Sequence, residues 1–89
     1  MPRMGTYCQE VIDGNTFLTV DGKLIRLAGV NTPKKGQQGW SLAKVFLEER
    51  VLARAIEYEE IDTVYGQILA EVWRDNESVN EHMRRMLYR

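Results

Sequence analysis

Cysteine, long apolar runs and net charge are all scarce in this chain. Its one cysteine, Cys8, excludes an internal disulfide and a cysteine-based metal site, and we expect it to be a buried hydrophobe rather than a reactive thiol. No apolar run reaches the length of a signal-peptide core or of a membrane span. We therefore expect a cytoplasmic protein that has no membrane partner.

The formal net charge is only -1, so any binding of nucleic acid must come from a local patch rather than from the molecule as a whole. The charge is nevertheless uneven. Residues 1–56 carry eight basic and five acidic side chains, whereas residues 57–89 carry four basic and eight acidic ones. Such halves can form a polyanion-binding face or a dipolar molecule that associates head to tail, and the sequence leaves both open.

The 89 residues are expected to form one domain, 1–89, because the length and the balance of apolar and charged residues are those of a small globular protein. Runs rich in β-branched and aromatic residues predict five strands. These strands are residues 6–12, 16–20, 23–30, 54–59 and 67–74. The pair Asp21-Gly22 predicts a tight hairpin turn, and residues 62–66 a turn before the last strand.

Two helices complete the pattern. The first is predicted over residues 40–53, after a polar loop of residues 31–39, with Ser41 as N-cap. Its apolar stripe is predicted to include Leu42, Val45 and Phe46.

The second helix begins at Ser78, which stands three residues before Glu81 as a capping box requires. The face expected to pack on the barrel is formed by Val79, Met83, Met86 and Leu87. Basic residues follow in the last turns, at Arg84, Arg85 and Arg89. We weigh a favourable interaction with the helix dipole above a nucleic-acid contact for these three.

The order strand, strand, strand, helix, strand, strand, helix is that of an OB-fold. This is a mainly β, five-stranded barrel, here with two helices. Many unrelated functions use this fold, so the order of elements by itself predicts no activity.

Several short motifs now become informative together. They are VIDGNT at 11–16, IRLAGVNTP at 25–33, DTVYGQILAEV at 62–72 and SVNEHM at 78–83. With the helix near Trp40, they resemble the staphylococcal nuclease (thermonuclease) family, whose pattern reads V-x-D-G-D-T, R-L-x-G-I-D-T-P-E, D-x-Y-G-R-x-L-A and V-N. The resemblance covers nearly the whole chain and implies the same OB-fold.

The family hydrolyses phosphodiesters with calcium, a cation that requires oxygen ligands and above all carboxylates. Carried over position by position, the two metal carboxylates are Asn15 and Asn31 here. The proposed base is Lys34, and one phosphate-binding arginine is Gln67. The other arginine is retained as Arg26.

Thr32 keeps the position that lends the metal a backbone oxygen. The resemblance therefore implies a degenerate site at Asn15, Asn31 and Thr32, with no metal and no other cofactor expected and with nuclease activity lost. Two aspartates replaced by asparagine and a glutamate replaced by lysine add four positive charges, and an arginine replaced by glutamine removes one. The altered pocket could thus hold phosphate without a metal.

Arg26, Lys34 and Lys35 are the candidate phosphate ligands, and Tyr65 is the candidate platform for stacking on a base. Weak binding of single-stranded nucleic acid follows, although the same lysines also fit a merely solvated loop. Trp40 and Trp73 are better explained as core or interface residues. The chain's one histidine, His82, is expected to face solvent.

Two alternatives stay open. An altered metal-dependent phosphodiesterase could use Asp13 and Arg26. A protein-interaction or homodimerisation module could use the final helix, because secreted bacterial members of the family continue through a further helix that covers the barrel. The residues expected at that surface are Met83, Met86, Leu87 and Tyr88.

Overall fold

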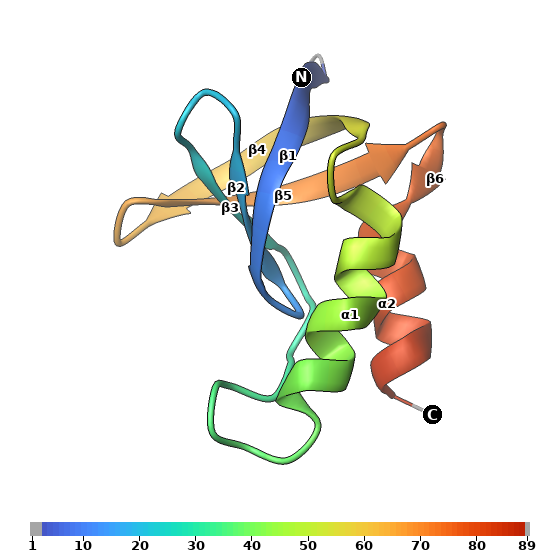
Figure 1. Cartoon of the computed structure of the whole chain (residues 1–89). Coiled ribbons are helices and arrows are strands. Elements are labelled where there is room, and N and C mark those ends of the chain that lie inside the picture. The colour runs from blue at the N-terminus through green and yellow to red at the C-terminus, as the bar shows by residue number, and fades with distance from the viewer. Residues whose placement is uncertain (1–2, 89) are drawn as a thin grey trace.

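A computed structural model describes residues 3–88 as a β-barrel with two helices at one end (Figure 1). The strands are β1 (Met4–Asp13), β2 (Thr16–Thr19), β3 (Leu24–Leu27), β4 (Ala55–Val64), β5 (Gln67–Arg74) and β6 (Glu77–Ser78). The helices are α1 (Trp40–Val51) and α2 (Val79–Leu87). Neither helix of this part of the chain is long and apolar enough to cross a membrane.

The five longer strands form a closed ring, which confirms the predicted OB-fold. They follow the order β3-β2-β1-β4-β5, and β3 then pairs with β5 in parallel, as Ile25 opposite Ile68 and Leu27 opposite Ala70. All other pairings are antiparallel. The two-residue strand β6, which the sequence did not predict, continues the sheet beyond β5.

The barrel interior is filled by alternate residues of its strands. Phe17, Ile25 and Val72 are fully buried, as strand alternation requires of one sheet face. Cys8 is buried as predicted, and burial raises the pKa of its thiol to about 11. α2 adds Val79 and Met83 to this core, while Leu87 is partly buried against it.

The predicted apolar face of α1 is wrong at Leu42 and Val45 but confirmed at Phe46, which is partly buried against the core. Ala43, Leu47 and Val51 are the buried residues of this helix, whereas Leu42 is 58% exposed and Val45 is 45% exposed. The prediction followed the spacing of apolar residues, but the barrel approaches α1 so closely at Ala43 that a small side chain is the one that fits between them. A Cβ atom on Gly14 of the barrel would lie only 2.8 Å from Ala43 Cβ.

The start of α1 also differs from the prediction. Its N-cap is Gly39 in the left-handed conformation (φ 88°), without a side-chain cap, so Ser41 lies inside the first turn. Glycine reaches this conformation without a steric penalty, which allows the helix to begin at Trp40.

The hairpin of β4 and β5 is longer than predicted. β4 does not end at residue 59 but continues to Val64, and residues 62–64 belong to the strand rather than to a turn. The turn consists of Tyr65 and Gly66, whose φ angles of 51° and 77° are both positive, as a two-residue hairpin turn of this hand requires. The hairpin projects from the barrel at the left of Figure 1.

The start of α2 agrees with the prediction. The Ser78 hydroxyl accepts a hydrogen bond of 3.1 Å from the Glu81 backbone N–H. Arg85 forms an ion pair with Glu81, while Arg84 donates to the Ala28 carbonyl at 3.3 Å. Arg89 lies outside the described residues.

Candidate functional site

The turn between β1 and β2 packs against the chain that leaves β3, and Asn15 is the fully buried contact between them. Its Nδ2 donates to the Val30 carbonyl at 2.8 Å, and its Oδ1 accepts from the Thr16 hydroxyl at 3.0 Å. Its backbone carbonyl accepts from the Leu27 N–H at 2.7 Å. Both ends of the amide therefore have protein partners. The end that faces the Val30 carbonyl must be a hydrogen-bond donor, because a carbonyl can only accept.

Gly14 lies so close to the following loop that no other residue fits. A Cβ atom there would meet the Thr32 Oγ1 atom at 2.2 Å. That hydroxyl is buried and has no hydrogen-bond partner within residues 3–88. Glycine in the DGN motif is thus required by the close approach of two backbone segments, and it brings Thr32 to the site.

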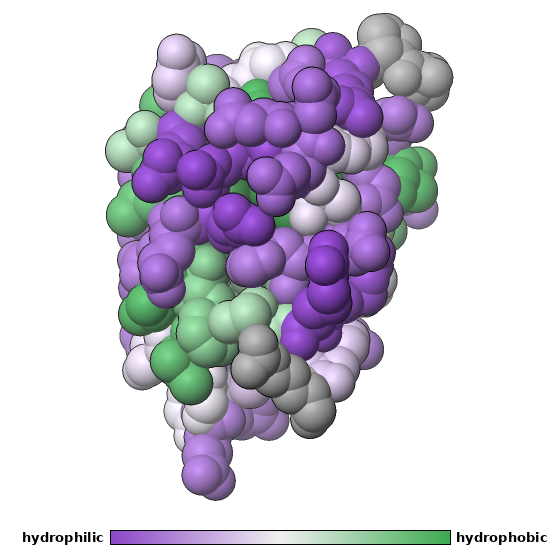
Figure 2. Space-filling model, turned by 90° about the vertical axis from the view of Figure 1, so that its right-hand side faces the viewer, coloured by the Kyte–Doolittle hydropathy of each residue, from purple (hydrophilic) through white to green (hydrophobic). Residues whose placement is uncertain are grey.

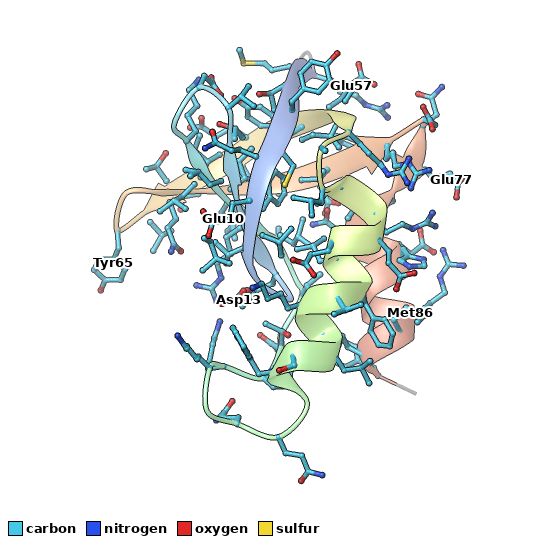
Figure 3. The ribbon with its side chains drawn as sticks, viewed as in Figure 1. Glu10, Asp13, Glu57, Tyr65, Glu77 and Met86 are labelled. Atoms are coloured by element: carbon cyan, nitrogen blue, oxygen red, sulfur yellow. The ribbon has the colours of Figure 1, made fainter. Side chains whose placement is uncertain are left out.

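Asp13 and Lys34 form an ion pair at the edge of this site, with 3.8 Å between Oδ2 and Nζ. The Asp13 side chain is only 15% exposed, and its Oδ1 accepts from the Asn15 backbone N–H at 3.1 Å. Figure 3 shows Asp13 at the end of β1, beside α1 and facing the loop before that helix. The carboxylate is held in place by the backbone, and a lysine ammonium is its partner.

The loop that carries Lys34 is anchored at its start and closed by a hydrogen bond of its own. Asn31 donates its backbone N–H to the Tyr88 hydroxyl at 2.6 Å, and that hydroxyl donates to the Asn31 carbonyl at 3.2 Å. The Lys34 N–H donates to Gln37 Oε1 at 2.7 Å. A hollow of about 610 Å³ lies between this loop, α1 and the end of α2, and Asn31 and Thr32 form part of its wall.

Arg26 lies on the outward face of β3, between the buried residues Ile25 and Leu27. It stands opposite Thr16 of β2 and Leu69 of β5. Within the described chain its guanidinium has no ion pair and no hydrogen bond. It is therefore a cation available to a ligand on the outer surface of the barrel.

Gln67 begins β5 and Tyr65 precedes it in the hairpin turn. Tyr65 is fully exposed and points away from the barrel at the hairpin tip (Figure 3). Figure 3 places it well apart from Asp13 at the other end of the site. The fold thus joins Asp13, Asn15 and Lys34 in one cluster, but it does not bring Tyr65 into that cluster.

Residues 24–86 match the family model of staphylococcal nuclease homologues. The chain belongs to this family. The matched segment includes the loop with Asn31 and Lys34, whereas Asp13 and Asn15 precede it. A comparison with curated proteins found no match.

The residues at the family's metal position do not fit a calcium ion. The oxygen of Asn15 accepts a hydrogen bond from the Thr16 hydroxyl, and the carboxylate of Asp13 is paired with the Lys34 ammonium. No group of three or more histidine, cysteine or acidic side chains suited to a metal occurs within residues 3–88. Calcium is bound through several oxygen ligands whose negative charge sets its affinity, and such a set is not assembled here.

Asn80 is the structural residue of this region whose role sequence reasoning missed. It is fully buried, its Oδ1 accepts from the Val72 N–H at 2.9 Å, and its Nδ2 donates to Ala28 and Ala70. It thereby fixes α2 to β5 and to the segment after β3. Its place in the SVNEHM motif was the available signal.

Two further sequence expectations concern side chains away from this site. His82 is half-buried rather than fully exposed, and the Arg50 Nη2 atom lies 3.2 Å from its Nδ1. Burial, and then the charge of Arg50, lower the pKa of His82. Trp73 is partly buried, with the Arg3 guanidinium stacked 3.8 Å from its ring centroid.

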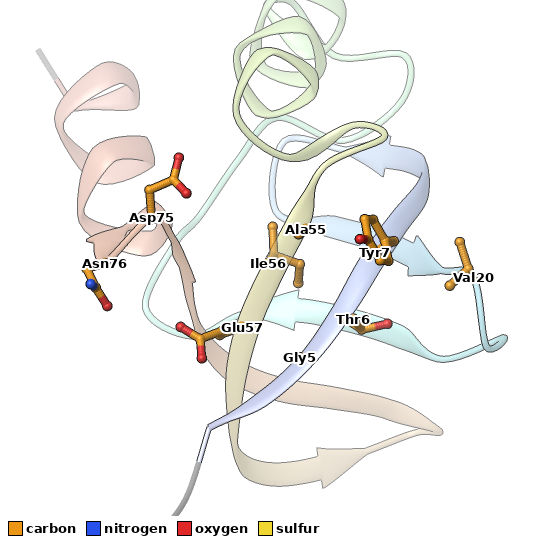
Figure 4. A pocket seen from close by; sticks show the side chains of 9 residues that line it. All are labelled: Gly5, Thr6, Tyr7, Val20, Ala55, Ile56, Glu57, Asp75 and Asn76. Atoms are coloured by element: carbon orange, nitrogen blue, oxygen red, sulfur yellow. The ribbon is translucent and has the colours of Figure 1, made fainter.

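A groove of about 590 Å³ crosses the strands β1 and β4 (Figure 4). Its walls include Tyr7, Val20 and Glu57. None of the residues that the family pattern assigns to the site lines this groove, so the groove is separate from that site.

Proposed function

We propose that this staphylococcal nuclease-like domain binds phosphate groups of single-stranded nucleic acid without a metal and does not hydrolyse them. The observation that carries the proposal is the position of Lys34, whose ammonium lies 3.8 Å from the Asp13 carboxylate. A permanent cation of the protein therefore stands where the family pattern has an acidic residue that acts with a metal.

The chemistry of hydrolysis lacks its main contributors. The Lys34 side chain is 55% exposed and ends in an ammonium rather than a carboxylate, so it does not replace the acidic residue that would activate water. Asn15 and Asn31 bring no negative charge to attract a divalent cation. Gln67 cannot neutralise charge that develops on a phosphate in the transition state, as an arginine would.

Binding of phosphate requires cationic groups but neither a metal nor a base, and the site retains such groups. Arg26 has a free guanidinium, whose planar set of donors matches phosphate oxygens. Lys34 and Lys35 lie in the loop of residues 31–39, where Lys34 contacts Asp13 at the end of β1. Asp13 opposes them, and Glu59, Glu60 and Asp62 make the neighbouring hairpin acidic. We therefore expect weak binding that depends strongly on salt.

The test combines cleavage and binding of the same strands. Fluorescently labelled single-stranded DNA and RNA are incubated with the domain, with calcium and with a chelator, and are titrated at low and high salt. We expect no cleavage, and binding whose logarithmic salt slope is about -0.7 for each phosphate neutralised. Cleavage that requires calcium would overturn the proposal in favour of an altered phosphodiesterase.

Matched variants locate the binding. Arg26→Gln and Lys34→Gln are expected to weaken binding and to reduce the salt slope by roughly 0.7 each. Arg54→Gln and Lys23→Gln are the controls, because they remove the same charges from exposed positions outside the site. Equal losses in the controls and in the site variants would show that binding is nonspecific attraction to any basic residue.

A second candidate function is contact with a protein, and the exposed apolar residues of the helical end favour it. Leu42 and Val45 of α1 are exposed, as is Tyr88 after α2. Apolar side chains gather at the lower left of Figure 2, in the half of the molecule where the helices lie. Met83 is fully buried, so it cannot contribute to such a surface as the sequence suggested. Light scattering of the parent and of Leu42→Glu over a range of concentrations distinguishes a self-associating domain from a monomer.

A further inference from the structure

Two lysines converge on one indole ring next to the site. The Nζ atom of Lys44 lies 5.3 Å from the centroid of the Trp40 ring, and that of Lys35 lies 5.9 Å from it. Both distances are within the range of a cation–π contact. Trp40 is partly buried, so the ring is held by the protein and part of it remains accessible.

The fold builds this cluster from two segments. Lys44 follows Trp40 by four residues in α1, which places the two side chains on one helix face. Lys35 comes from the loop, which the Gln37 N–H closes by donating to the Lys34 carbonyl at 2.8 Å. The Trp40 N–H donates to the Gln37 carbonyl at 3.2 Å, so loop and helix are joined directly at the tryptophan.

The lysines have no acidic partner. Within residues 3–88, ion pairs involve Arg3, Lys23, Lys34, Arg50, Arg74 and Arg85, but neither Lys35 nor Lys44. Their charge is therefore not compensated by a carboxylate. An ammonium held over an aromatic face is readily transferred to a phosphate, and the ring face that it leaves is suited to a base.

We infer that Lys35, Trp40 and Lys44 form a contact site for a single-stranded nucleic acid, in which one base stacks on the indole and the adjacent phosphates bind the two lysines. The inference rests on the proposed function, because Lys34 and Lys35 are adjacent and one strand can reach both sites. Duplex is disfavoured, since its bases are stacked on one another and do not offer a free face.

Charge distinguishes this ligand from a protein partner. An apolar protein surface placed on Trp40 would remove two unpaired ammonium groups from water, which is unfavourable. A strand of nucleic acid supplies both an aromatic face for the ring and anions for the lysines. A single strand therefore offers a partner to each of the three side chains, Lys35, Trp40 and Lys44.

The test uses the two tryptophans as matched reporters. In Trp73→Phe the remaining tryptophan is Trp40, and in Trp40→Phe it is Trp73, which lies under the Arg3 guanidinium. Each variant is titrated with oligothymidylate of about twelve nucleotides and, separately, with a duplex of the same length. We expect the single strand to quench the fluorescence of Trp40 but not that of Trp73, and the duplex to quench neither.

Affinity provides the second measurement. Trp40→Leu is expected to weaken binding of the oligonucleotide by about tenfold, the usual effect of losing one stacked base. Lys35→Gln with Lys44→Gln changes an exposed and a partly buried lysine, neither of which belongs to the core, so it tests the site even if the tryptophan variant folds poorly. This double variant is expected to reduce the logarithmic salt slope by about 1.4.

The outcomes separate this inference from the proposed function. Unchanged affinity of a folded Trp40→Leu, together with weakened binding by Lys34→Gln, would overturn the inference and leave the proposed function intact. Absence of oligonucleotide binding by the parent at low salt would overturn both. Quenching of Trp40 with a loss of affinity in Trp40→Leu would establish the site.

Discussion

Asn15→Asp, which introduces the residue that the family pattern implies at this position, should destabilise this protein. In the parent, the amide nitrogen of Asn15 donates to the Val30 carbonyl at 2.8 Å, and the side chain is fully buried. Asn15→Asp keeps the shape of the side chain but replaces that donor by an oxygen. Two acceptors then face each other inside the protein, and one of them carries a charge near neutral pH.

The size of the effect follows from two contributions. Leaving the buried Val30 carbonyl without its donor costs roughly 1–3 kcal/mol. Ionising a buried carboxyl without a cationic partner costs roughly 3–5 kcal/mol, unless the group takes up a proton instead. Because a proton restores a donor to the carbonyl and removes the charge, we expect a net loss of about 3 kcal/mol in the free energy of unfolding at pH 7.

The pH dependence has a definite sign. Burial beside a carbonyl raises the pKa of the introduced carboxyl above its value in the unfolded chain, so the folded state binds more protons. The deficit relative to the parent is therefore largest at neutral pH and shrinks by about 1.4 kcal/mol per pH unit as the pH falls through the window between the folded and unfolded pKa values.

Urea denaturation of parent and variant, followed by circular dichroism from pH 4 to pH 8, measures both the loss and its pH dependence. Asn31→Asp is the matched control, because Asn31 is exposed and the same substitution there should change the stability by no more than about 0.5 kcal/mol. If Asn15→Asp were as stable as the parent at pH 7, the donor role of Asn15 would be refuted.

Calcium links this prediction to the family site. The variant Asn15→Asp, Asn31→Asp, Lys34→Glu, Gln67→Arg should be stabilised by calcium if the positions correspond as the family pattern indicates. A calcium concentration of about one hundred times Kd would contribute about 2.7 kcal/mol. No stabilisation of a folded variant by calcium would count against that correspondence.

Three other substitutions or labelling tests follow from the contacts. Asp13→Asn should tighten oligonucleotide binding roughly two- to fivefold, because it releases the exposed Lys34 ammonium from its ion pair; weaker binding in fluorescence anisotropy would contradict this. Cys8 should react slowly with iodoacetamide in the folded protein, since the thiol is buried and its pKa is about 11, and labelling should follow the urea unfolding curve; rapid labelling of the native protein would be inconsistent with this core. Leu27→Ala should cost roughly 2–5 kcal/mol, and Leu42→Ala less than about 0.5 kcal/mol, so similar losses in urea denaturation would show the helix face to be misassigned.

The sequence by itself determined the features that depend on neighbours along the chain. The Ser78 cap of α2 and the presence of a turn at Asp21-Gly22 depend on contacts between residues a few positions apart, so the local pattern predicted them. The expected two-residue turn is wrong, because the connection runs from Thr19 to Leu24 and only Gly22 has a positive φ angle. The order of strands and helices, together with the family motifs, was likewise sufficient for the OB-fold. The parallel contact of β3 with β5, which closes the ring, was not among those predictions.

Only the tertiary structure decided which residues meet across long separations. The buried face of α1 depends on the space left by Gly14, and the position of Lys35 over Trp40 depends on how the loop closes onto the helix. The resemblance implied an aspartate at the position of Asn15, but the sequence did not show that the Asn15 amide nitrogen donates to the Val30 carbonyl. The physical reason is that a hydrogen bond or a packing contact depends on distance in space, and residue type limits which contacts are possible without fixing which are made.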